Sequence, residues 1–469
     1  MSGSTHLFKN VAWISIGQIT SKSLRAIFVL YAARIVGVTE YGIATYILAQ
    51  LGLFTVLADC GVAQLVTREC ARGSSADQEH YVRTGFAIKG LLATIMLLLL
   101  FISLNFHSSA IQMSETAILL TLVIFVCDSM KDFFSGVMVA REKNKTEALI
   151  NLSTSSLLIF VGIPLMYLEK TSTRLLSVYA AASLLAIIIE SIVFYRAGLI
   201  KRSKIFFSHM KDLLKTSYIF GLQSGFMIII FAFDSIMIGW YLNQHALGLY
   251  GASQKLPLLL NMIPSFIAQG FLPELARSAH KDSAHFSRVL SKALTLMALI
   301  GIPIFIGGEI VADKLILSLF GTEYAGAPQI FRVLLGMNLF CFFSGILTIS
   351  LYAHDKQKNV VRSTAAGAVT SIVGNLIMIP IWGIIGSAIA SVLAQAVMLI
   401  LFIYDIRSIA SVKLSFDATW KHFFIAIIAM TLVAVGLITL NLPIIIVIPI
   451  AAATYGLIIF KSVKKLITT

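Results

Sequence analysis

Charged residues are scarce in this sequence. Only 12% of its 469 residues are charged and 58% are hydrophobic, whereas a soluble domain has about 25% charged residues. The scarcity excludes an ordinary soluble protein and indicates an integral membrane protein. The net charge of +14 would indicate nucleic-acid binding in a soluble chain. In a membrane protein, Lys and Arg accumulate in cytoplasmic loops instead, so we expect no nucleic-acid partner.

Motifs for covalent chemistry are also missing. The sequence has no GxxxxGK[ST] phosphate loop, no GxSxG turn and no HExxH zinc motif, and its nine histidines are scattered. The four cysteines form no CxxC pair, so we interpret them as small hydrophobic residues. The segments between apolar runs are too short for an enzymatic domain. We therefore expect neither an enzyme nor a cofactor or metal, which leaves transport.

Fourteen apolar segments are long enough to cross a membrane, since a span needs roughly 20 mostly apolar residues. They are residues 10–33, 41–64, 84–106, 116–138, 147–168, 175–195, 216–240, 247–270, 289–311, 328–351, 360–380, 383–404, 420–440 and 442–460. Basic residues gather after the even-numbered segments, for example Arg141, Lys143 and Lys145. The positive-inside rule then predicts that both termini are cytoplasmic. The first segment contains Lys22 and Arg25, so we interpret it as a span and not as a cleavable signal peptide.

Short stretches recur in the two halves of the chain. "AREKNK" at 140–145 follows the fourth segment and "AHDKQK" at 353–358 follows the tenth, while "RECAR" at 68–72 and "PELAR" at 273–277 follow the second and eighth. Six spans per copy give both copies the same orientation, as in parallel-repeat transporters. We predict an all-α membrane protein with an N-terminal lobe (1–200), a C-terminal lobe (201–406) and two added spans (407–469). Such lobes work by alternating access around a central pathway.

The first predicted span carries a polar face. Ser15, Gln18, Lys22 and Arg25 are spaced by three, four and three residues, which places them on one side of a helix. A cation inside a membrane costs on the order of 3 kcal/mol and faces a cavity or a partner. We interpret this face as the lining for an anionic ligand. The alternative is a structural ion pair with acids on neighbouring spans.

Acidic residues also lie within the predicted spans of the first lobe. Asp128, Lys131 and Asp132 share one helical face with Ser135. The lysine neutralises the two acids within the helix, or one acid carries a coupling ion. Asp59, in the second span, is predicted to be another inward-facing acid.

The second half has equivalent residues. Asp234 is a further candidate for ion coupling or for a buried ion pair, and Gln254, Lys255 and Arg332 are candidate cavity residues. Arg332 equally fits an interfacial position near the outer mouth. Glu190 is set aside, because it lies close enough to the cytoplasmic end of its span to reach water.

Several longer stretches stand in a characteristic order: "DCGVAQLVTRE" at 59–69, "DSIMIGWYLNQHALGLYGASQKL" at 234–256, "PELAR" at 273–277 and "GTEYAGAPQIFRVLL" at 321–335, with the two repeated loops. This pattern resembles the multidrug/oligosaccharidyl-lipid/polysaccharide (MOP) exporter superfamily and, within it, Wzx-type polysaccharide flippases. With the six-plus-six arrangement, the resemblance covers most of the first 405 residues. Many relatives have twelve spans, whereas fourteen resembles the lipid II flippases.

The resemblance implies a bacterial inner-membrane protein with a MATE-like fold. Its expected substrate is undecaprenyl-diphosphate-linked oligosaccharide, from O-antigen or a related surface polysaccharide, which moves from the cytoplasmic to the periplasmic leaflet. The diphosphate would meet Lys22 and Arg25, while the polyprenyl tail stays in the membrane lipid. Coupling to an ion gradient would involve Asp59, Asp128 or Asp234. A polysaccharide polymerase and a chain-length regulator are the expected neighbours.

Two other functions compete with this one. A MATE-type multidrug antiporter shares the six-plus-six plan but handles cations, so it should have an acidic cavity, and Lys22 and Arg25 argue against it. A membrane scaffold for polysaccharide assembly enzymes would transport nothing. Neutralising the charges inside the membrane would leave the function of such a scaffold intact.

Overall fold

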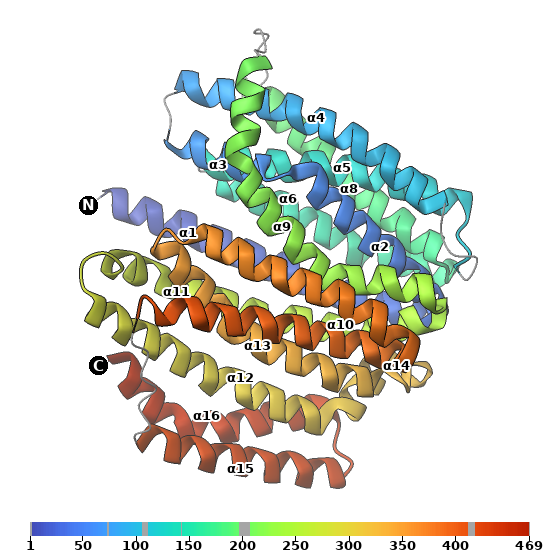
Figure 1. Cartoon of the computed structure of the whole chain (residues 1–469). Helices are drawn as coiled ribbons and strands as arrows, with labels where there is room; N and C mark the ends of the chain where they lie inside the picture. Colours follow the sequence, from blue (N-terminus) through green and yellow to red (C-terminus); the bar gives the residue numbers. More distant parts are fainter. Residues whose placement is uncertain are drawn as a thin grey trace. The chain divides into compact units, whose positions relative to one another are not determined.

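The computed structural model describes residues 2–72, 75–105, 111–141, 143–196, 207–410 and 418–468, and every regular element in these ranges is a helix (Figure 1). This confirms the all-α prediction. The elements are α1 (Ser2–Val36), α2 (Val38–Asp59), α3 (Val62–Arg72), α4 (Ser75–Asn105), α5 (Glu115–Ala140), α6 (Asn144–Leu157), η1 (Leu158–Gly162), α7 (Ile163–Leu168), α8 (Ser172–Arg196), α9 (Phe207–Tyr241), α10 (Gln244–Leu260), α11 (Met262–Ser278), α12 (Ser283–Phe320), η2 (Thr322–Tyr324), α13 (Ala327–Ala353), α14 (Gln357–Arg407), α15 (Ala418–Thr439) and α16 (Ile444–Thr468).

The predicted spans fall on these helices. Ten helical segments in the described ranges are long and apolar enough to cross a membrane, and the protein is a multi-pass membrane protein. One of the ten, α14, holds two predicted spans, 360–380 and 383–404. Gly383 interrupts it with a non-helical backbone (φ 60°, ψ −139°), three residues after Pro380. The break therefore lies where the two predicted spans meet.

The chain forms two compact units, Met1–Gly248 and Leu249–Thr469. In the first unit, α5 packs against α8, α1 packs against α6, and α9 packs against α2 and α3. In the second unit, α13 packs against α12 and α14, and α15 packs against α16. These pairs are consecutive helices in the second unit, which short connections favour, whereas in the first unit they join helices that are far apart in the sequence.

Close approach of α1 to α6 sets up the polar region of the first unit. A Cβ atom added to Gly17 of α1 would lie 2.5 Å from the Cβ of Ala148 on α6. Small residues allow such contacts between helices in a membrane, where packing and not the hydrophobic effect holds helices together. α5 and α8 are joined by an aromatic contact, with the rings of Phe134 and Phe194 4.3 Å apart.

A sharp break separates α2 from α3. Cys60 and Gly61 both have left-handed backbones, with φ values of 47° and 76°. The backbone of α9 passes directly over the break, so a Cβ on Gly61 would lie 2.5 Å from the Ser217 carbonyl oxygen and 2.6 Å from the Gly221 nitrogen. The sequence supplies glycine at the point where both the turn and the contact require it.

This geometry predicts that Gly61→Ala destabilises the protein by about 1–3 kcal/mol, because alanine is strained at positive φ and its methyl group meets the α9 backbone. The measurement is the thermal unfolding midpoint of the purified protein in detergent. Gly270→Ala in α11 is the matched control, since a Cβ there has no neighbour within 4 Å. Equal midpoints for the two variants would contradict the role given to Gly61.

Candidate functional site

A polar cavity of about 240 Å³ lies among α1, α5 and α6 of the first unit. Its polar lining consists mainly of Lys22 and Arg25 from α1, Ser135 from α5, and Asn144, Glu147 and Asn151 from α6. The side chains of Ser15 and Gln18, on the same predicted face as the two cations, lie outside the described residues. The two cations of α1 therefore face a polar cavity between helices.

Neither cation in this cavity is neutralised by an ion pair within the described ranges. Arg25 donates from Nε to the Ser155 hydroxyl at 3.2 Å and from Nη2 to the Thr154 hydroxyl at 3.5 Å. Hydroxyl groups orient a guanidinium without cancelling its charge. Lys22 and Arg25 are both exposed to the cavity, so their charge is available to an anion.

Glu147 is the acid in the cavity. Its Oε1 accepts hydrogen bonds from the Ser135 hydroxyl and from Nδ2 of Asn151, both at 2.7 Å. Its Oε2 is buried and has no hydrogen-bond partner in the described part of the chain. The residues of α6 were not among the sequence candidates. Asn144, Glu147 and Asn151 follow a spacing of three and four residues that marks a shared helical face.

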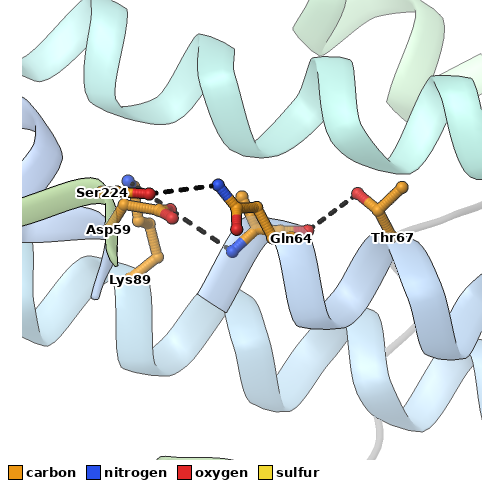
Figure 2. A network of polar contacts seen from close by, with 6 residues as sticks. Asp59, Gln64, Thr67, Lys89 and Ser224 are labelled. Carbon is orange, nitrogen blue, oxygen red and sulfur yellow. Dashed lines mark hydrogen bonds and ion pairs between the residues drawn. The ribbon is translucent and has the colours of Figure 1, made fainter. Parts of the chain in front are cut away.

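A second polar group lies at the break between α2 and α3. Lys89 of α4 is fully buried, and its Nζ lies 2.9 Å from Oδ1 of Asp59, whose side chain is 19% exposed. The same Oδ1 accepts from the backbone N–H of Ala63 at 3.3 Å, at the beginning of α3. Figure 2 shows this pair beside the contact between Gln64 of α3 and Ser224 of α9, which measures 3.2 Å. Asp59 thus ties α4 to the broken helix.

The sequence predicted an inward-facing acid at Asp59 but not its partner. Lys89 is the sixth residue of the predicted span 84–106. A lysine within a membrane span needs a partner or a cavity, so the sequence could have identified Lys89 as a candidate partner of Asp59. Together Asp59 and Lys89 cancel each other's charge. Of the two roles considered for charges within the spans, ion coupling and a structural ion pair, this geometry fits the structural ion pair.

The acids on α5 and α8 form a third group. Asp128 accepts a 2.6 Å hydrogen bond from the Ser183 hydroxyl of α8. Lys131 is half-buried and Asp132 is exposed on the surface of the unit. Glu190 of α8 is fully buried. The interpretation that Glu190 reaches water is therefore wrong, because the packed face of α8 and not its distance from the helix end decides its environment.

The remaining predicted site residues are not part of the lining of the cavity among α1, α5 and α6. In the first unit, Asp234 is buried, and its Oδ1 accepts from the backbone N–H of Ser235 at 2.6 Å. In the second unit, Gln254 is buried and Lys255 is half-buried. Arg332 contacts two acids of α12, Asp313 and Glu309.

The described residues hold no group of three acidic, histidine or cysteine side chains placed to bind a metal ion. The four cysteines form no disulfide within the part of the chain that the structure describes. What the cavity offers chemically is two cations, one acid, and amide and hydroxyl groups on its wall. Such a surface binds and releases an anionic or polar ligand.

Comparison with known proteins gives two family matches. The family model described as "Polysaccharide biosynthesis protein" matches residues 7–279, and the model described as "Lipid II flippase MurJ" matches residues 246–445. Among curated proteins, the "Probable low-salt glycan biosynthesis flippase Agl15" of Haloferax volcanii is 22% identical over 407 residues, which cover 86% of this chain and 84% of that protein. The "Probable flippase AglR" of the same species is 24% identical over 167 residues, 34% of this chain and 35% of that protein.

Solved structures share the fold. "Lipid II flippase MurJ, inward closed conformation" superposes with a TM-score of 0.74 at 15% identity, covering 97% of this chain and 99% of that chain. "Inward-facing conformation of a multidrug resistance MATE family transporter of the MOP superfamily" gives a TM-score of 0.64 at 13% identity, covering 85% and 98%. At these identities the likeness shows the fold, and it confirms the predicted MATE-like fold.

The Asp59–Lys89 pair generates an asymmetric prediction. Asp59→Asn should cost on the order of 3 kcal/mol, because it leaves a fully buried ammonium without its counter-charge. Lys89→Met should cost less, because water reaches the remaining Asp59. The double variant should recover part of the loss, as a double-mutant cycle of unfolding midpoints would show.

Arg68 and Glu69 of α3 provide the control, since that ion pair is largely exposed. Arg68→Met should change the midpoint little. Equal losses for Asp59→Asn and Lys89→Met, with no recovery in the double variant, would mean that the two residues act independently.

Proposed function

The chain belongs to the polysaccharide biosynthesis protein family, and on this basis we propose that it is a MOP-superfamily flippase for lipid-linked oligosaccharide. The proposed substrate is an undecaprenyl-diphosphate-linked repeat unit of O-antigen or a related surface polysaccharide. It moves from the cytoplasmic to the periplasmic leaflet of a bacterial inner membrane in an ion-coupled, alternating-access cycle. Both termini are proposed to be cytoplasmic. The flippases named among the relatives support this function.

The observation that carries the proposal is the pair of cations in the polar cavity. Lys22 and Arg25 face the same cavity without an ion-pair partner among the described residues. Unpaired cations inside a membrane protein mark a substrate or ion pathway. A diphosphate offers the oxygen atoms that guanidinium and ammonium groups bind through charge-assisted hydrogen bonds.

The rest of the cavity wall fits a phosphate that carries a sugar. Asn144, Asn151 and Ser135 supply amide and hydroxyl groups, which pair with sugar hydroxyls as donors or acceptors. A cationic drug would meet Lys22 and Arg25 at the same place and be repelled. The cavity therefore favours an anionic substrate over the cations of a multidrug antiporter.

The second unit contains a cavity suited to a hydrocarbon chain. It measures about 480 Å³, its wall is almost wholly apolar, and it lies among α10, α12, α13, α15 and α16. Its polar Tyr455 hydroxyl donates to the Leu299 carbonyl and is thereby satisfied. We propose that part of the polyprenyl chain lies here, which gives the two added C-terminal spans a role. A polymerase and a chain-length regulator are proposed to work beside the flippase.

The central prediction concerns the two cations. Lys22→Ala combined with Arg25→Ala removes two charge-assisted contacts of about 1.5–3 kcal/mol each, which weakens diphosphate binding by on the order of a hundredfold or more. The readout is mass spectrometry of lipid-linked oligosaccharides in a deletion strain. Return of the wild type should clear the accumulated diphosphate-linked unit, and the double variant should not clear it.

Lys170→Ala combined with Arg174→Ala is the matched control, because it removes two cations of the same unit that do not line the cavity, Lys170 between α7 and α8 and Arg174 in the first turn of α8. This control should clear the intermediate like the wild type, and all three proteins should reach the membrane in equal amounts. Clearance by the cavity double variant would remove the site assignment. A deletion strain in which every lipid intermediate is unchanged would remove the flippase function itself.

The apolar cavity gives a separate prediction. Ala452→Phe places a ring in the cavity, whereas Ala453→Phe alters a neighbouring exposed residue that does not line it. We expect Ala452→Phe to slow clearance of the same lipid intermediate, because the ring occupies volume that the chain needs, while Ala453→Phe leaves clearance unchanged. Equal clearance in the two variants would exclude this cavity as a binding place for the chain.

A further inference from the structure

Glu190 of α8 is a fully buried acid. Its side chain has 0% exposure, and neither Oε1 nor Oε2 has a donor within the residues that the structure describes. Two other acids within the helices of the unit have partners, since Asp59 contacts Lys89 and Asp128 accepts from the Ser183 hydroxyl. An isolated carboxylate in an apolar interior is so unfavourable that the group takes up a proton and becomes neutral.

The charged groups that face Glu190 come from two helices. Those acting on it electrostatically are Glu147 of α6, then Lys131, Asp132 and Asp128 of α5. The other elements packed against α8 add little. Glu40 of α2 binds the backbone N–H of Ser172 at the opposite end of α8, and η1 and α7 contain no charged residue. Glu147 is the strongest of these neighbours, and it is an acid.

Glu147 has an unpartnered oxygen of its own. Its Oε1 is held by Ser135 and Asn151, while Oε2 is buried without a donor. Two carboxyl groups that interact with each other cannot both be ionised at little cost. A proton on Glu190 removes this repulsion and makes Glu190 itself a hydrogen-bond donor. A metal ion fits less well, because the described residues hold no group of three ligands for one.

We propose that Glu190 and Glu147 form a proton-binding site, and that a proton there and an anion at Lys22 and Arg25 are bound together. The second half of this statement rests on the proposed function, because it takes the cavity to hold a diphosphate. The first half rests on the two acids alone.

The coupling follows from the position of Glu147. This residue lines the cavity that contains Lys22 and Arg25 and is also the strongest electrostatic neighbour of Glu190. An anion in the cavity therefore disfavours a negative charge on the acid pair, and away from bulk water this repulsion is weakly screened. Linkage is reciprocal, so a bound proton strengthens anion binding by the same factor. A site in which protons and substrate compete would show the opposite behaviour.

The test is infrared difference spectroscopy of the full-length protein in lipid bilayers. The C=O stretch of a protonated, buried carboxyl group is recorded at neutral pH for the wild type, for Glu190→Gln and for Glu115→Gln. Glu115 is the matched control, an exposed glutamate in the first turn of α5. We expect the band in the wild type and in Glu115→Gln, and its loss in Glu190→Gln. In a titration toward alkaline pH, inorganic pyrophosphate should raise the pH at which half of the wild-type band is lost.

The outcomes test the proton site and the joint binding of proton and anion separately. Absence of any band that depends on Glu190 would overturn the proton site, even where the strain still clears its lipid intermediates. A midpoint pH that pyrophosphate lowers or leaves unchanged, while filter binding shows labelled pyrophosphate bound, would overturn the joint binding. If pyrophosphate does not bind at all, the anion site of the proposed function fails and the joint binding fails with it. The band of Glu190 is read without any ligand.

A second measurement covers the case in which Glu190→Gln does not fold. Dicyclohexylcarbodiimide reacts with protonated carboxyl groups in apolar surroundings, and peptide mass spectrometry of the labelled wild-type protein locates the adduct. We expect the label on Glu190 or Glu147 and its absence from Glu115. Labelling confined to other acids would overturn the proposed site.

Discussion

An ionised side chain inside a membrane needs a partner, because lipid offers neither water nor counter-charge. The first unit meets this constraint in three different ways. Lys89 is paired with Asp59 at the helix break, Lys22 and Arg25 face a polar cavity, and Glu190 is buried without a donor among the described residues. Each arrangement implies a different role. A paired charge is structural, an unpaired cation binds an anion, and a buried acid without a hydrogen-bond partner binds a proton.

The same constraint places polar residues at the breaks in the helices. Breaking a helix frees backbone groups that must be satisfied within the protein. At the start of α3, Asp59 accepts the N–H of Ala63. Between α10 and α11 of the second unit, Nδ2 of Asn338 donates to the Pro257 carbonyl at 2.8 Å and to Oδ1 of Asn261 at 2.7 Å. Polar side chains in these spans therefore do not all mark the substrate pathway.

Local pattern predicted the helices well, because length and apolarity decide whether a segment spans a membrane. The interruption of α14 was visible in the sequence as Pro380 and the glycine that follows it. The polar face of α1 was visible from its spacing, and the structure places Lys22 and Arg25 on a cavity. The partner of Asp59 was not predicted, because hydropathy averages a single lysine such as Lys89 into its apolar surroundings. The expectation that Glu190 reaches water was wrong, because the position of a residue near the end of a helix does not tell which face of that helix is packed.

The surroundings of Asp59 and Glu190 distinguish two acids that the sequence alone places in similar apolar segments. For Asp59 to exchange a proton during transport, it would have to abandon Lys89, and a buried ammonium without a partner is strongly unfavourable. Among the described residues, Glu190 has no such partner to lose. Its charge can change at the cost of rearranging one neighbour, Glu147, which already lies on the wall of the cavity. Coupling between an ion and a substrate requires a group that responds to both, and in the described part of the first unit Glu147 is the acid that touches the cavity and acts on a second buried acid. The physical argument therefore moves the coupling site from the paired acid at the break of α2 and α3 to the unpaired acids of α6 and α8.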